Sequence, residues 1–134
     1  MTIVVDASVA VKWILPEAGS DAAAALRERD PDLIAPSLIA AEIGNTIWKA
    51  VQRGHVRRAD ALAGIDAALA FFQSLIPIEE LRVRALALAI NLRHPIYDCF
   101  YLALAERERC ALITADRRLV EAAKALKSVK VQVL

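Results

Sequence analysis

The stretch from Tyr97 to Leu119 constrains the fold more than any other, because it places an aspartate at each outer end of a helix followed by a strand. Asp98 precedes seven consecutive apolar residues, Cys99 to Ala105, which are apolar around the whole helical circumference and so predict a buried helix. Ala111 to Thr114 indicates a short buried strand, and Asp116 follows its carboxyl end, where open α/β sheets bind their ligands. Because the helix leaves this edge and the strand returns to it, we expect Asp98 and Asp116 to share a site.

Short strands alternate with helices along the rest of the chain. The expected strands are Thr2–Val5, Leu33–Ala35, Ser74–Ile78, Ala111–Thr114 and Val129–Val133. The expected helices are Val9–Leu15, Ser20–Arg29, one that starts at Pro36-Ser37 and is capped by Gly54, Val56–Gln73, Glu79–Leu92, the Asp98 helix that starts at Pro95, and Arg117–Leu126, with Asp30-Pro31-Asp32 as a turn. This alternation predicts an α/β fold whose central, mainly parallel sheet of about five short strands is covered by helices on both faces.

Length and composition limit the class of protein. The chain has 134 residues, which predicts a single domain over residues 1–134. Its longest apolar run is seven residues, so we expect no membrane-spanning segment, and the first residues lack the basic leader of a secretion signal. Cys99 and Cys110 would lie about 16 Å apart along a helix, beyond disulfide reach, which predicts reduced thiols and a cytoplasmic location.

Four acidic residues occupy positions that such a fold brings to one edge of its sheet: Asp6, Glu42, Asp98 and Asp116. Asp6 and Asp116 follow strands, Asp98 begins a helix, and Glu42 lies early in the helix after the second strand. Taken singly, the aspartates are also explained as helix caps or as partners of a helix dipole, and Glu42 as a solvated residue. Their combination favours a shared site.

Four neighbouring carboxylates repel one another, and a divalent cation would remove that conflict. The candidate ligands are all oxygens, with no Cys or His at ligand spacing, which favours Mg²⁺, or Mn²⁺ in its place, over Zn²⁺. A water on such a cation can attack a phosphodiester. Ser8 and Thr114 each lie two residues from an acid and could orient that water or the acid, although local bonding to the backbone explains them as well.

Four short motifs follow one another with the order and spacing of a known family: VVDASV, PSLIAAEIGNTIW, YDCFYLALA and TADRRL. Over essentially its whole length the chain resembles a PIN domain and, within that superfamily, the VapC toxins of bacterial and archaeal toxin-antitoxin modules. The resemblance implies a three-layer α/β/α sandwich and a metal-dependent endoribonuclease with an acidic quartet of Asp6, Glu42, Asp98 and Asp116. It also implies that Asp6 and Asp98 bind the metal directly, that Asp116 and Glu42 bind a second metal or act through water, and that Asn45 supports them.

Other conspicuous side chains have structural explanations. Trp13 and Trp48 lie in apolar helical patterns, so we expect core or interface positions rather than stacking on RNA bases. His55 and His94 flank turns without a partner at ligand spacing, and we place both outside the site. The better candidates to hold RNA phosphates are Arg117 and Arg118, beside Asp116, ahead of the patch formed by Arg53, Arg57 and Arg58.

The leading hypothesis is a Mg²⁺-dependent endoribonuclease that acts as the toxin of a type II toxin-antitoxin module. Its expected partners are an RNA substrate and a small cognate antitoxin, and the two amphipathic helices between Ser37 and Gln73 favour a homodimer and a groove for an antitoxin helix. The alternative is an inactive PIN-fold module that binds RNA or protein. A phosphotransfer enzyme with an aspartyl nucleophile is disfavoured, because Ser8 stands where the haloacid-dehalogenase pattern needs a second aspartate.

Overall fold

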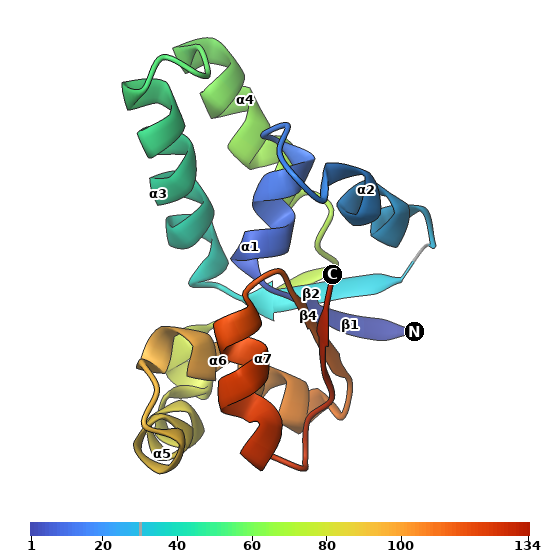
Figure 1. Ribbon diagram of the computed structural model, residues 1–134, viewed down its shortest axis with the longest axis vertical. Coiled ribbons are helices and arrows are strands. Elements are labelled where there is room, and N and C mark those ends of the chain that lie inside the picture. Colours follow the sequence, from blue (N-terminus) through green and yellow to red (C-terminus); the bar gives the residue numbers. More distant parts are fainter. Residues whose placement is uncertain (30) are drawn as a thin grey trace.

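Residues 1–29 and 31–134, which the computed structural model of the protein describes, form a five-stranded parallel sheet between two groups of helices (Figure 1). The strands are β1 (Thr2–Val5), β2 (Asp32–Pro36), β3 (Ser74–Ile76), β4 (Ala111–Thr114) and β5 (Val131–Val133), in the spatial order β3-β2-β1-β4-β5. β1 is central, with Val4 opposite Ile34 of β2 and Leu112 of β4. The predicted parallel α/β sheet is confirmed.

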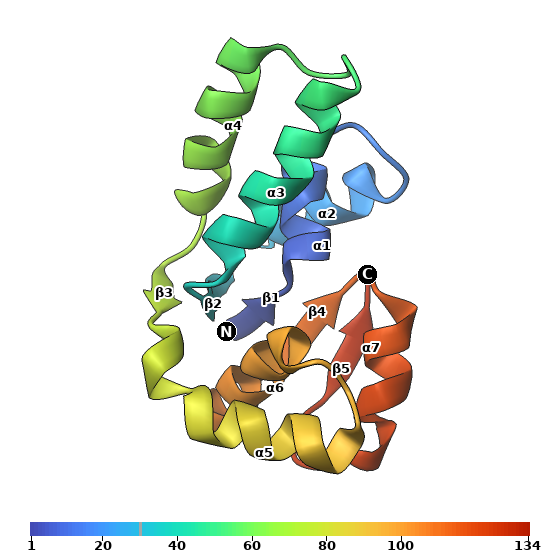
Figure 2. The same ribbon diagram turned by 90° about the vertical axis from the view of Figure 1, so that its left-hand side faces the viewer.

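Helices cover both faces of this sheet. They are α1 (Ala7–Ala10), α2 (Ser20–Glu28), α3 (Ile39–Gln52), α4 (Arg58–Leu69), α5 (Arg82–Leu92), α6 (Ile96–Glu108) and α7 (Arg117–Ala122), with short 3-10 segments η1 (Val11–Trp13), η2 (Ile78–Glu80) and η3 (Ala123–Ala125). α1 to α4 lie on one side of the sheet and α5 to α7 on the other, while α3 and α4 project from the body as an antiparallel pair (Figures 1 and 2). The structure is therefore the expected three-layer α/β/α sandwich.

Several element boundaries differ from the prediction. The first helix begins at Ala7 rather than Val9 and continues as the 3-10 segment η1. The fourth ends at Leu69, because the Gln73 N–H already donates to Leu33 O, at 2.8 Å, and so joins the chain to the sheet. Of the predicted turn, Asp30 lies outside the described residues.

Pro36 ends a strand instead of starting a helix. It is the last residue of β2 and pairs with Ile76 of β3. Proline has no N–H to donate, and the next donor, the Ser37 N–H, bonds to Ile76 O at 2.7 Å. The third helix therefore begins only at Ile39.

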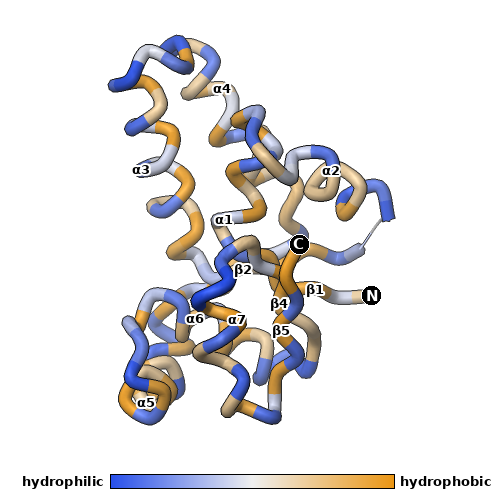
Figure 3. Tube along the Cα trace, viewed as in Figure 1, coloured by the Kyte–Doolittle hydropathy of each residue, from blue (hydrophilic) through white to orange (hydrophobic). Residues whose placement is uncertain are grey.

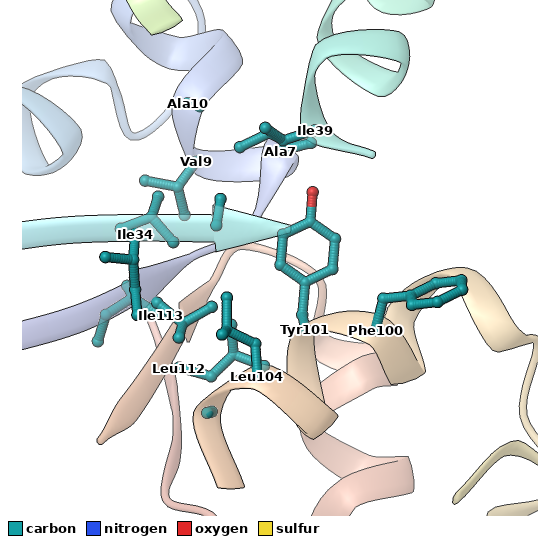
Figure 4. Packing of buried hydrophobic residues seen from close by; sticks show 14 of the residues in the cluster. Ala7, Val9, Ala10, Ile34, Ile39, Phe100, Tyr101, Leu104, Leu112 and Ile113 are labelled. Atoms are coloured by element: carbon teal, nitrogen blue, oxygen red, sulfur yellow. The ribbon is translucent and has the colours of Figure 1, made fainter. Parts of the chain in front are cut away.

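The core lies between α6 and the sheet, as the all-round apolar pattern predicted. All residues from Cys99 to Ala105 are buried, and Leu104 lies beside Leu112 of β4 (Figure 4). Apolar stretches also run along α3, α4 and α5 (Figure 3). Cys99 and Cys110 are free thiols, and burial raises the pKa of Cys99 to about 11. Among the helices that the structure describes, none has the length and apolarity to cross a bilayer.

Candidate active site

The order of the strands places a switch point between β1 and β4. From β1 the chain moves outward through β2 to β3, and it then returns to the opposite side of β1 with β4 and β5. Asp6 follows β1 and Asp116 follows β4, so both stand at the carboxyl edge on either side of this point, where open α/β sheets bind ligands. The Asp6 N–H donates to Ile113 O at 3.0 Å and fixes the first aspartate against β4.

Asp6 is the most buried of the candidate acids, with only 5% of its surface exposed. Its Oδ2 accepts hydrogen bonds from Ser8 Oγ and Thr114 Oγ1, both at 2.7 Å. These hydroxyls in turn accept from the N–H groups of Ala115 and Asp116, each at 3.0 Å. Ser8 and Thr114 therefore orient the acid itself. Asp6 is the N-cap residue of α1 by position, yet within the described residues its side chain makes no capping bond.

Glu42 lies in the first turn of α3 and is partly buried. Its Oε1 accepts a 2.6 Å hydrogen bond from the hydroxyl of Tyr101 on α6. Burial raises the pKa of Glu42 to about 7, the Tyr101 hydrogen bond opposes the rise, and the charges of Asp6 and Asp98 add to it. Burial likewise raises the pKa of Asp6, and the Asp98 charge contributes to that rise against the Thr114 and Ser8 hydrogen bonds.

Asp98 and Asp116 open onto one cavity of about 300 Å³, lined by His94, Pro95, Asp98, Asp116 and Arg118. Asp98 lies in the first turn of α6, whose N-cap residue is Pro95, and its Oδ2 is 2.6 Å from His94 Nε2. Asp116 is the N-cap residue of α7, where its Oδ1 accepts from the Arg118 N–H at 2.9 Å. The capping explanation is therefore correct for Asp116, which still faces the cavity.

His94, which the sequence placed outside the site, contacts Asp98 with its ring and lines the cavity. A signal existed: His94 precedes Asp98 by four residues, across the proline that starts α6. Tyr101 was missed as well, although it follows Asp98 by three residues and so lies about one turn further on the same helix. Asn45 is exposed one turn after Glu42 on α3.

Of the two tryptophans, Trp13 packs against the core, as its apolar helical pattern predicted. The Trp13 ring lies 5.5 Å from Phe71 and 5.7 Å from Phe72 between ring centroids. Its Nε1 donates to Ala23 O at 2.9 Å. Trp48 is 57% exposed on the projecting pair of helices, so its side chain lies outside the core.

The donor set at this edge fits a hard divalent cation. Within residues 1–29 and 31–134, no three His, Cys, Asp or Glu side chains form a closed cluster around a metal position. Each acid instead has a protein partner: hydroxyls for Asp6, a phenol for Glu42, an imidazole for Asp98 and a backbone N–H for Asp116. A cation would offset the repulsion that helps to raise the pKa values of Asp6 and Glu42, and carboxylate oxygens are the ligands that Mg²⁺ and Mn²⁺ prefer.

The PIN domain model matches residues 3–125 of the chain. The chain therefore belongs to the PIN domain family. It is 34% identical over 128 residues to ribonuclease VapC3 of Pyrobaculum aerophilum, which covers 94% of this chain and 98% of that protein. It is 33% identical over 123 residues to ribonuclease VapC9 of Mycobacterium tuberculosis, which covers 92% of each chain.

A solved structure agrees with this assignment of the fold. The structure of VapBC2 from Rickettsia felis, bound to a DNA fragment from their promoter, matches with a TM-score of 0.72 at 14% identity, over 99% of this chain and 98% of that one. The predicted resemblance to the VapC proteins is confirmed.

Proposed function

We propose that this protein is a divalent metal-dependent endoribonuclease that acts as the toxin of a type II toxin-antitoxin module. The observation that carries the proposal is the position of the acids at one edge of the sheet: Asp6 follows β1, Asp116 follows β4, and Asp98 and Asp116 line the same cavity. The relatives VapC3 and VapC9, which match over nearly the whole chain, are named ribonucleases, and they support the class of reaction.

Mg²⁺, with Mn²⁺ as a substitute, would supply a nucleophilic water and stabilise the charge that develops on the phosphodiester. Asp6 and Asp98 are the proposed direct ligands, while Glu42 and Asp116 bind a second ion or act through water. Ser8 and Thr114 keep the Asp6 carboxylate in one orientation, since both donate to its Oδ2.

RNA would enter from the cavity beside Asp98 and Asp116. Arg118 lines this cavity with a side chain that is 91% exposed, and Arg117 precedes it at the start of α7. Guanidinium groups bind phosphate oxygens through paired hydrogen bonds, so these arginines are the proposed contacts for phosphates that flank the cleaved bond.

The experiment is cleavage of purified RNA with Mg²⁺, with Mn²⁺ and with EDTA. Asp6→Asn, Asp98→Asn and Asp116→Asn should each lower the rate at least about 100-fold, since each removes charge that holds the stabilising cation. Asp66→Asn, at an exposed position of α4, is the matched control and should cleave like the wild type. Cleavage that persists in EDTA, or that survives the site substitutions, would contradict the proposal.

The alternative of an inactive binding module makes the opposite prediction. The protein would then bind RNA or a protein without cleaving RNA at any Mg²⁺ or Mn²⁺ concentration. Expression in cells separates the two as well. An active toxin should arrest growth when produced alone, and Asp98→Asn should relieve the arrest.

The proposal includes a protein partner for the groove between α3 and α4. This groove has a volume of about 350 Å³, and its apolar lining includes Ile47, Trp48, Leu62 and Ile65. Leu62 is 55% exposed, as is typical of residues that a partner covers. We propose that a small cognate antitoxin binds here and that the chain forms a homodimer. Light scattering at micromolar concentration tests the homodimer, and Leu62→Asp should prevent rescue of growth by the antitoxin.

A further inference from the structure

Tyr101 connects the helix of Asp98 to the helix of Glu42. It lies on α6, is completely buried, and extends its ring past the carboxyl end of β2 toward the start of α3, where Ile39 lies (Figure 4). Its hydroxyl donates to Glu42 Oε1 at 2.6 Å. The 59 residues that separate the two in sequence make this a contact between distant elements.

A phenylalanine would fill nearly the same space in the core, so packing alone does not require the hydroxyl. A buried hydroxyl without a partner is unfavourable, and here the partner is a carboxylate, which gives a short, charge-assisted hydrogen bond. A phenol is protonated at neutral pH, so the Tyr101 hydroxyl is the donor and the Glu42 carboxylate the acceptor.

We propose that Tyr101 is a positioning residue, whose buried hydroxyl holds the Glu42 carboxylate in the orientation in which it contributes to metal binding. This inference rests on the proposed function. Its physical basis is that Oε1 is committed to the phenol, which restricts rotation of the carboxylate. Helix α6 thereby positions two of the acids: Asp98 lies on it, and Glu42 is bonded to it through Tyr101.

Calorimetric titration with Mn²⁺ tests the role with a readout other than activity. Tyr101→Phe should weaken Mn²⁺ binding about 10-fold, the effect expected when a group that orients a metal ligand is lost. The matched control is Tyr97→Phe, since Tyr97 lies on the same helix but is 61% exposed, and its Mn²⁺ affinity should equal that of the wild type. RNA cleavage by Tyr101→Phe should fall at limiting Mn²⁺ and recover at saturating Mn²⁺, and a Tm in EDTA equal to that of the wild type should exclude loss of folding as the cause.

A second comparison separates positioning from structural support. In a Glu42→Ala background the hydroxyl has no carboxylate to orient, so adding Tyr101→Phe should leave the remaining Mn²⁺ affinity unchanged. A further loss of affinity in the double variant would overturn the inference.

The outcomes also distinguish this inference from the proposed function. A wild type that neither binds Mn²⁺ nor cleaves RNA overturns both. A wild type that does both, with Tyr101→Phe indistinguishable from it, overturns only the role of Tyr101.

Discussion

Glutamine in place of Glu42 removes one charge from the acidic edge with little change in shape. The Glu42 pKa is raised from 4.5 to about 7 by burial, against the hydrogen bond from Tyr101, with further contributions from Asp6 and Asp98. Glutamine keeps a carbonyl oxygen that can accept from the Tyr101 hydroxyl. Glu42→Gln therefore isolates the cost of the charge in the metal-free protein.

The rise in pKa sets the size and the sign of the effect. A shift from 4.5 to about 7 corresponds to about 3 kcal/mol, and we take about 2 kcal/mol because solvent screens a partly buried group. The folded state binds the Glu42 proton more tightly than the unfolded chain does. Protonated Glu42 therefore contributes its full stabilisation below about pH 4.5, and this contribution is lost as the pH rises to about 7. Glu42→Gln has no such loss. Its free energy of unfolding should therefore exceed that of the wild type by nearly zero at low pH and by about 2 kcal/mol at high pH, which is about 7 °C in Tm for a chain of this size.

Thermal melting in EDTA between about pH 4.5 and about pH 8 measures this advantage directly. Glu28→Gln, at an exposed position of α2, is the control and should follow the wild type at every pH. Added Mn²⁺ should reverse the order, because a cation that binds only the folded state stabilises the wild type more than the variant. Equal melting temperatures of wild type and Glu42→Gln at the upper end of this range in EDTA would refute the reasoning.

Three further substitutions test the packing and the metal site. A Cβ at Gly64 would lie 2.7 Å from Cγ2 of the β-branched Ile14. Gly64→Ala should therefore lower Tm, because overpacking costs about 1–3 kcal/mol and the gain in helix propensity is only about 1 kcal/mol. A Cβ at Gly44 would meet Ile65 at an ordinary 3.5 Å, so Gly44→Ala should raise Tm by about 3 °C; the same sign for both glycines would contradict the contacts. Asp98→Asn should show a much smaller Mn²⁺-induced rise in Tm than the wild type, and an equal rise would remove Asp98 from the metal site.

Some features of the candidate site could be predicted from the sequence because they are local, and others could not because they join distant residues. The strand-end positions of Asp6 and Asp116 could be predicted, because a strand of buried residues followed by an aspartate is visible in a few consecutive letters. The hydrogen bonds that orient the acidic side chains could not be predicted. Thr114 reaches Asp6 across 108 residues, and Tyr101 reaches Glu42 across 59, so neither pair has a periodic signal.

The sequence by itself determined the architecture, because apolar periodicity and turn residues act over short distances along the chain. Helix α6 is buried because it is apolar all round, and the strands alternate with helices that cover both faces of the sheet. Only the tertiary structure decided which side chains meet. It placed His94 against Asp98, and it brought the apolar faces of α3 and α4 together around an open groove. The physical reason is that such contacts depend on the packing angles of whole elements and on side-chain rotamers, which no local pattern specifies.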